Sequence, residues 1–370
     1  MKQKTKARKI DVLMPTTSQY HVLHHFARKL YEALVRAGMN CRLLEGNERI
    51  TAALNNPPDF TIGFNGALKM EDGSLFCDYI KVPHVACLVD PPYRFPEITE
   101  SRNVIITCDD KECCEMLHAK GFPRTAFMPH AVESELCPDI KSKRIYDVVF
   151  LGTCIDFESR RKHWKEEFPQ GVVKVMEAAA EAALSEDETS FMTVLQKKLS
   201  PWKHQKAYEE VELYIKGKDR FNLVNAVAGH KVHVFGGGDD WKKMMKGKTN
   251  VVVHPAVDYE AALDIMKKSK IVLNSSIKNK LGAHERIFTA AACGAVVVTN
   301  DNAYIRENFK HGKDMILYKC GGFDALNEDI SHLLANPDKL EAIAAAGRKN
   351  VMHNHTWDCR VKMLTEILGV

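Results

Sequence analysis

The sequence SKIVLNSSIKNKLGAHERIFTAAACGAVVVTN, residues 269–300, decides the fold. It contains two short apolar runs, residues 271–273 and 295–298, and each has the length of a buried strand and ends in polar residues. Between them, residues 285–293 carry apolar side chains at helical spacing, and Gly294 follows as a residue that commonly ends a helix. Strand, polar loop, helix and strand make a βαβ unit, whose loop lies at the carboxyl edge of a parallel sheet.

The polar loop of this unit is the first candidate binding site, because open parallel sheets bind ligands at the carboxyl ends of their strands. The residues expected at that edge are Asn274, Ser275, His284, Glu285 and Arg286. Free backbone N–H groups and the helix dipole favour a phosphate there, and Arg286 adds a forked cation. Ordinary βαβ packing with a solvated loop explains the same pattern, so the sequence leaves both interpretations open.

The rest of the chain repeats the alternation of strands and helices, which predicts an α/β protein with doubly wound parallel sheets. Glycine is absent between Met14 and Gly38, in the first strand–loop–helix segment, and this argues against a nicotinamide or flavin enzyme. Further strands are expected at residues 10–14, 41–44, 60–64, 83–89, 104–107, 125–128, 146–151, 231–235 and 251–253.

A charged, apolar-poor segment at residues 133–144 separates two successive βα sheets and predicts two domains. We expect an N-terminal domain at residues 1–140 and a C-terminal domain at residues 141–353. The C-terminal domain includes a highly charged helical insertion at about residues 156–228. Residues 354–370 form a last amphipathic helix.

Composition narrows the classes of function. The chain has 370 residues, is 45% hydrophobic and 27% charged, and its net charge of +4 is too even to indicate a nucleic-acid partner. Eleven scattered cysteines without a Cys-x-x-Cys pair indicate reduced core thiols in a cytoplasmic protein and argue against structural zinc. No apolar run approaches the ~20 residues that span a bilayer. The basic N-terminus, residues 2–9, permits peripheral contact with the inner membrane face without requiring it.

Other strand ends supply further candidates. Asp90 follows the strand at 83–89 and precedes two prolines, which suits a ligand-facing loop, although a carboxylate that merely caps a turn fits as well. Gly152 and Thr153 follow the strand at 146–151. Three consecutive glycines, beginning with Gly236 and Gly237, follow the strand at 231–235. Such a run lets the backbone approach a ligand closely, and a flexible turn explains the same run equally.

Six segments carry a family resemblance in the family's order. They are RIYDVVFLGT (144–153), KVHVFGGGDDW (231–241), YEAALDIMKKSKIVLNSS (259–276), HERIFTAAACGAVVVTN (284–300), YIRENFKHGKDMILY (304–318) and HNHTWDCRV (353–361). Together they resemble the CgeB-like, spore-maturation branch of the group 1 glycosyltransferases, which have the GT-B fold. PHVACLVDPPY (83–93) resembles the acceptor-side domain of the same proteins more weakly.

The resemblance implies a hexosyltransferase or related sugar transferase of the EC 2.4 class that needs no metal or cofactor. Two Rossmann-like domains would face a cleft, the second binding a nucleotide-diphosphate sugar and the first a glycan, lipid or protein acceptor. The last helix would cross back to the first domain. Arg160 and Arg161 stand where such enzymes carry a basic residue for the diphosphate. For an inverting transfer, Asp90 is the first candidate for the general base and His21 the second.

One departure from the family concerns the donor site. Retaining members carry two glutamates there, and these positions hold Leu281 and Thr289 in this chain. Glu285 lies one turn before Thr289 and can reach the same region. The stereochemistry therefore stays open. So does a rival function, in which a degenerate GT-B protein binds a glycan or partner without transfer, and a third, weaker interpretation is a sugar-nucleotide epimerase.

Overall fold

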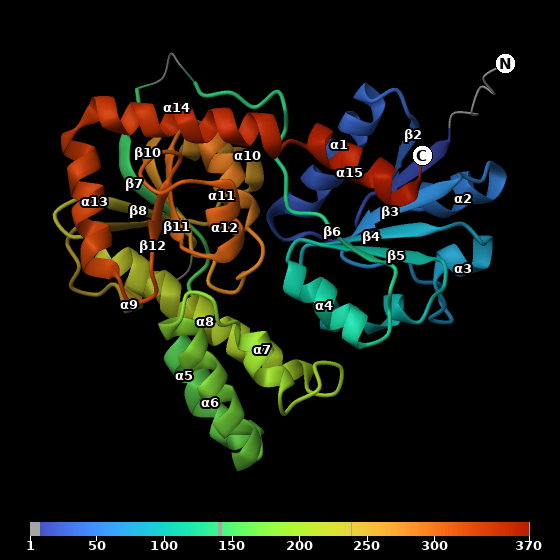
Figure 1. Cartoon of the computed structure of the whole chain (residues 1–370), viewed down its shortest axis with the longest axis horizontal. Helices are drawn as coiled ribbons and strands as arrows, with labels where there is room; N and C mark the ends of the chain where they lie inside the picture. Colours follow the sequence, from blue (N-terminus) through green and yellow to red (C-terminus); the bar gives the residue numbers. More distant parts are fainter. Residues whose placement is uncertain (1–7, 140–142, 238, 370) are drawn as a thin grey trace. The chain divides into compact units, whose positions relative to one another are not determined.

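The computed structural model describes residues 8–139, 143–237 and 239–369, and these form two compact units. Unit 1 consists of Met1–Ser134 with His355–Val370, and unit 2 is Glu135–Asn354. Each unit has its own parallel sheet with helices on its faces (Figure 1). The predicted alternation of strands and helices is therefore confirmed in both.

Unit 1 contains a six-stranded parallel sheet of order β2-β1-β3-β4-β5-β6. Its strands are β1 (Lys9–Leu13), β2 (Asn40–Leu44), β3 (Phe60–Phe64), β4 (His84–Leu88), β5 (Val104–Cys108) and β6 (Thr125–Phe127). Its helices are α1 (Val22–Arg36), α2 (Glu48–Asn55), α3 (Phe76–Ile80), α4 (Lys111–Ala119) and α15 (Trp357–Leu368). β3 and β4 are buried along their whole length, as expected for central parallel strands covered on both faces.

The C-terminal helix α15 belongs to unit 1, as the resemblance implied. The Trp357 ring packs on Phe26 of α1 and Phe64 of β3, with ring centroids 5.7 and 5.9 Å away. Arg36 holds Asp358 through two hydrogen bonds of 2.9 and 2.8 Å, a bidentate pair. An aromatic anchor and a forked ion pair therefore fasten the end of the chain to α1.

Unit 2 contains a second six-stranded parallel sheet, of order β12-β11-β10-β7-β8-β9. Its strands are β7 (Tyr146–Leu151), β8 (Val232–Phe235), β9 (Val251–His254), β10 (Ser269–Leu273), β11 (Val296–Asn300) and β12 (Ile316–Tyr318). The helices that accompany the sheet are α9 (Asp239–Met244), α10 (Tyr259–Lys267), α11 (Glu285–Ala292), α12 (Ala303–Asn308), α13 (Phe323–Ala335) and α14 (Pro337–Asn354). β10, α11 and β11 form the βαβ unit that residues 269–300 predict.

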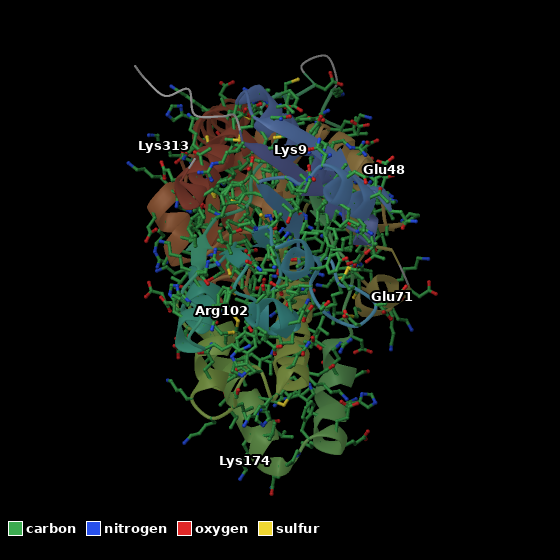
Figure 2. All side chains as sticks on the ribbon, turned by 90° about the vertical axis from the view of Figure 1, so that its right-hand side faces the viewer. Lys9, Glu48, Glu71, Arg102, Lys174 and Lys313 are labelled. Carbon is green, nitrogen blue, oxygen red and sulfur yellow. The ribbon has the colours of Figure 1, made fainter. Side chains whose placement is uncertain are left out.

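The expected helical insertion consists of α5 (Phe157–Glu167), α6 (Gln170–Ser185), α7 (Phe191–Gln196) and α8 (Gln205–Ala226). We call these four helices the helical region. Figure 1 shows it extending beyond one end of the second sheet, and Figure 2 shows the exposed Lys174 of α6 on its outer side. Leu223 and Val224, near the end of α8, are buried in the core of the sheet, so α8 connects the helical region to the strands.

Candidate functional site

The strand order of unit 2 places a ligand-binding edge between β7 and β10. β7 is the first strand of the sheet, and it lies between β8 and β10, so the order of strands reverses there. Doubly wound sheets bind ligands at the carboxyl ends of strands at such a point. Gly152 and Thr153 follow β7, and Asn274 and Ser275 follow β10. Four predicted residues are thus brought to one edge, which we call the switch edge.

Arg220 of α8 reaches this edge, although no sequence motif singled it out. Its Nη1 donates a hydrogen bond of 2.8 Å to the carbonyl oxygen of Thr153. Burial lowers the pKa of Arg220 to about 10, and the positive charge of Arg286 acts in the same direction. The switch edge therefore holds two guanidinium groups close enough to repel each other, one from α8 and one from α11.

Asp219 fixes this part of α8 to the sheet. Its buried carboxylate accepts hydrogen bonds from Ser275 Oγ at 2.6 Å, Tyr318 OH at 3.2 Å and Asn300 Nδ2 at 3.4 Å. Burial raises the pKa of Asp219, and these three donors oppose that rise. Because the donors follow β10 and lie at the ends of β11 and β12, a single side chain links α8 to three strands. Arg220, the next residue, is positioned by this network.

The N-terminus of α11 carries three of the predicted residues. His284 is the N-cap, and its Nδ1 accepts a hydrogen bond of 3.3 Å from the backbone N–H of Arg286. The Glu285 carboxylate lies against His284 Nδ1, and its Oε1 is 3.8 Å from Arg286 Nη2. All three side chains are partly exposed. The helix start therefore combines a cation and a carboxylate with the positive end of the α11 dipole.

Thr289, the residue at the expected ribose position, is only 1% exposed. Its Oγ1 donates to the Glu285 carbonyl oxygen at 3.1 Å and lies 3.3 Å from the hydroxyl of Tyr259. These contacts tie α11 to α10. Glu285 at 12% side-chain exposure is the accessible group of the two.

Arg160 and Arg161 lie on α5, within the helical region. Arg160 Nη1 is 2.7 Å from Glu210 Oε1, and Arg161 Nη2 is 3.4 Å from Glu177 Oε1. The structure thus gives both arginines carboxylate partners on neighbouring helices, whereas Arg220 and Arg286 are the cations that it brings to the switch edge.

Gly236 and Gly237 have a packing role. A Cβ atom on Gly236 would lie 2.0 Å from the Gly152 carbonyl oxygen, which also accepts a hydrogen bond of 2.9 Å from Trp241 Nε1. Only glycine lets the two strand ends approach so closely. Gly237 has φ +62°, in the left-handed region. The third glycine, at position 238, lies outside the described residues.

In unit 1, Asp90 follows β4 and is partly exposed. Its Oδ2 accepts a hydrogen bond of 2.9 Å from Asn65 Nδ2, and its Oδ1 lies 3.3 Å from Arg94 Nη1. Asn65 follows β3, so two strand ends hold this carboxylate at the carboxyl edge of the first sheet. His21 ends the short 3-10 helix Gln19–His21 before α1, where it is exposed, has φ +60° and packs against His24 with ring centroids 5.5 Å apart.

Over residues 8–139, 143–237 and 239–369, no three or more His, Cys, Asp and Glu side chains gather as a metal site. Over the same residues, no helix has the length and apolar character that crossing a membrane requires. Most of the basic N-terminus, considered above for membrane contact, lies outside the described residues.

Comparison with known proteins supports the architecture. A family model described as glycosyl transferase-like matches residues 220–366, which is less than half of the chain. A search of curated proteins finds no match. HepE from Anabaena, crystallised with UDP-glucose, superposes with a TM-score of 0.57 at 12% identity over 98% of this chain and 99% of that chain. Sucrose-phosphate synthase from Thermosynechococcus elongatus gives a TM-score of 0.56 at 9% identity over 98% of each.

A DNA-modifying β-glucosyltransferase, crystallised in the presence and absence of uridine diphosphoglucose, gives a TM-score of 0.57 at 10% identity over 98% of this chain and 99% of that chain. Identities this low establish the fold alone. The two six-stranded parallel sheets, the C-terminal helix that returns to unit 1 and these superpositions identify the fold as GT-B, the two-unit architecture of glycosyltransferases.

Proposed function

We propose that this protein is a glycosyltransferase that binds a nucleoside-diphosphate sugar at the switch edge of unit 2 and transfers its sugar to an acceptor. The observation that carries the proposal is the position of two guanidinium groups beside the point where the strand order reverses: Arg220 on the Thr153 carbonyl oxygen and Arg286 in the first turn of α11. The GT-B fold and the glycosyl transferase-like match over residues 220–366 support it. HepE and the β-glucosyltransferase, which have the same fold, were crystallised with UDP-glucose.

The chemistry of the two arginines suits a diphosphate leaving group. When the bond between sugar and phosphate breaks, negative charge grows on the nucleoside diphosphate, and fixed cations stabilise that charge most strongly in the transition state. Guanidinium groups bind phosphate oxygens in a forked geometry. The positive end of the α11 dipole favours the same negative charge. We propose that Arg220, Arg286 and this helix start supply the positive charge, so that transfer proceeds without a metal ion.

We propose that Glu285 contacts the ribose of the nucleotide-sugar donor. Thr289 is enclosed between α10 and α11, whereas the Glu285 carboxylate is partly exposed at the helix start. A carboxylate accepts hydrogen bonds from the two ribose hydroxyl groups. His284 lies against this carboxylate and limits its rotation.

On the acceptor side, we propose Asp90 as the general base. It is partly exposed at the carboxyl edge of the first sheet, and Asn65 holds one of its oxygens. A base at such a position removes a proton from an attacking hydroxyl. The six sequence segments support assignment to the CgeB-like branch, a hexosyl donor, and a glycan, lipid or protein acceptor. The eleven scattered cysteines, without a Cys-x-x-Cys pair, support a reducing, cytoplasmic environment.

Hydrolysis of nucleotide sugars in the absence of acceptor tests the proposal. UDP-glucose, GDP-mannose, dTDP-glucose and ADP-glucose are incubated with the parent protein and with the Arg286→Gln variant, and release of nucleoside diphosphate is measured. We expect slow hydrolysis of one donor by the parent and a loss of about tenfold or more in Arg286→Gln. Binding of a donor without hydrolysis, even with an acceptor mixture, would favour the rival function of a glycan-binding GT-B protein.

A further inference from the structure

Unit 2 has a concave site at the edge of its sheet opposite to the switch edge, and we call it the basal pocket. It has a volume of about 570 Å³ and is lined by Pro138, Asp139, Lys143 and Arg144 before β7, by the ends of α10 and α13, and by one side of α14. Its lining residues are Pro138, Asp139, Lys143, Arg144, Lys267, Lys270, Gly294, Leu334, Pro337, Leu340, Glu341, Ala344, Ala345 and Arg348. A volume in this range suits a small organic ligand.

The basal pocket is separate from the switch edge. Arg144 precedes β7, Lys270 is the second residue of β10 and Gly294 precedes β11, so the pocket lies at the amino ends of these strands. The switch edge lies at the carboxyl ends of the same strands, so the full length of the strands separates the two sites. Figure 1 shows α14, which forms one wall of the pocket, and the helical region at opposite ends of unit 2.

The charged groups of the basal pocket favour an anion. Five cations line it, Lys143, Arg144, Lys267, Lys270 and Arg348, against the two carboxylates Asp139 and Glu341. Outside the lining, Asp147 pairs with Lys270 at 2.6 Å and Asp264 lies 3.9 Å from Lys267. Five cations against these four carboxylates leave one net positive charge, and Lys143 and Arg348 are the cations outside the ion pairs named here.

The two arginines have unused hydrogen-bond donors. Arg144 Nη2 is 3.2 Å from Glu341 Oε2, but its Nη1 is buried and has no hydrogen-bond partner among the described residues. Arg348 donates only a long bond of 3.5 Å to the Leu136 carbonyl oxygen, and its buried Nε also has no partner there. Buried polar donors normally have partners, so these two groups point to a ligand that supplies acceptor oxygens.

Apolar residues make up much of the rest of the basal pocket's lining, which we call its apolar wall. It consists of Pro138, Leu334, Pro337, Leu340, Ala344 and Ala345. A free inorganic ion would leave this wall uncovered, whereas a ligand with a hydrocarbon part would cover it. We infer that the basal pocket is a second binding site of this protein, for a phosphate ester that carries an apolar group.

Isothermal titration calorimetry of the full chain tests the inference with hexyl phosphate, inorganic phosphate and hexan-1-ol. We expect one site for hexyl phosphate, with affinity about tenfold or more above that for inorganic phosphate, because each buried methylene adds to binding. Hexan-1-ol, which lacks the anion, should bind weakly. Vesicles containing phosphatidic acid, added as competitor, distinguish a lipid from a soluble ester as the source of the phosphate.

Variants localise the binding. The Arg144→Gln, Arg348→Gln double variant should weaken hexyl phosphate binding by about tenfold. Ala345→Glu, which adds a carboxylate at an exposed helix position and removes no contact, should weaken it by about fivefold. Lys349→Gln, an exposed neighbour outside the lining, and Arg286→Gln, at the switch edge, should leave it unchanged. Parental affinity in Ala345→Glu and in the double variant, or equal affinity for hexyl and inorganic phosphate, would overturn the inference.

Discussion

Arg220 Nη1 donates a hydrogen bond of 2.8 Å to the carbonyl oxygen of Thr153, joining the helical region to the loop after the first strand of the second sheet. The bond uses one of five guanidinium donors, and the buried Nε has no partner among the described residues. Asp219, one residue earlier, anchors the same turn of α8 to β11, β12 and the residue pair after β10. Helix α8 of the helical region thus places the Arg220 guanidinium at the switch edge.

Arg220→Gln should weaken binding of a nucleoside diphosphate by about tenfold to a hundredfold, because a charged hydrogen-bond donor to phosphate is lost. Isothermal titration calorimetry with the diphosphate that the parent binds measures the change. Arg161→Gln is the matched control, since its guanidinium pairs with Glu177 on the neighbouring helix, and its affinity should stay within about twofold. Equal losses of affinity in the Arg220→Gln and Arg161→Gln variants would contradict the assignment of Arg220, and not Arg161, to the diphosphate site.

Asp219→Ala should destabilise unit 2 by about 3 kcal/mol, because Ser275, Asn300 and Tyr318 would be left with buried donors and no acceptor. Hydrogen exchange measured by mass spectrometry on peptides from β10 to β12 reports this loss. Asp239→Ala, which removes an exposed carboxylate on α9, should change exchange in those peptides by less than about 0.5 kcal/mol. Unchanged protection in Asp219→Ala would mean that the network does not hold α8 to the sheet.

Stability of unit 1 should fall as the pH drops below 6.5. His84 is fully buried, bonded to Thr61 Oγ1 at 2.8 Å and the Gly66 carbonyl oxygen at 3.1 Å, and burial lowers its pKa to about 4. The unfolded chain takes up the proton near 6.5 and the folded protein only near 4, so between these values protons favour unfolding. Above pH 6.5 the group is neutral in both states and has no effect. The expected loss from His84 is about 3 kcal/mol.

A second histidine, His355, also lowers the stability of unit 1 in acid. Burial, and after it the charge of Arg360, lowers the pKa of His355 to about 3. His84→Gln should therefore remove about half of the acid-induced loss of stability. Urea unfolding between pH 7 and pH 4.5, followed by the ¹⁹F signal of 5-fluorotryptophan at Trp357, measures this in unit 1. His118→Gln, at an exposed position, should retain the full pH dependence. A His84→Gln variant with the parental slope would contradict the assignment.

Asp90→Asn should lower the rate of sugar transfer by about a hundredfold or more while donor affinity stays unchanged, because a general base contributes on this scale. Steady-state kinetics with the identified donor and acceptor separates kcat from KM. Asp72→Asn changes an exposed carboxylate of the same unit and should keep the parental rate. A folded Asp90→Asn protein at full rate would exclude Asp90 as the base.

Much of the fold follows from local pattern. Residues 269–300 alternate between apolar runs and helical spacing so regularly that β10, α11 and β11 agree with the expected limits to within two residues. The two sheets, the helical insertion and the last helix were predicted in the same way. The short helices α2 and α3 were not, because eight- and five-residue segments carry too little periodicity to identify.

The candidate site was predictable only where it belongs to a strand–loop–helix motif. Asn274, Ser275 and Arg286 follow the strand pattern, and the structure places them at the expected edge. Arg220 lies far along the chain in a charged helix, and only the fold brings it there. One signal was present: Asp219 interrupts the apolar stripe of Val211, Ile215 and Leu223, and a carboxylate in a buried stripe needs partners.

The glycines after β8 show what a sequence pattern leaves open. A run of glycine suggested close approach of a ligand, but the group that approaches Gly236 is the Gly152 carbonyl oxygen. The sequence indicates that a side chain is not tolerated at these positions, but it does not indicate which neighbouring group excludes the side chain. Likewise, Arg160 and Arg161 match the family position for a phosphate ligand, yet their carboxylate partners come from helices α8 and α6.

The most direct test of the central claim, that unit 2 binds a nucleoside diphosphate at the switch edge, is calorimetric titration of the parent protein with UDP, GDP, dTDP and ADP. The account predicts that at least one binds at a single site without added metal, and that Arg220→Gln and Arg286→Gln each weaken it by about tenfold or more. A parent protein that binds none of the four, or that binds one equally well when both arginines are replaced, would contradict the account.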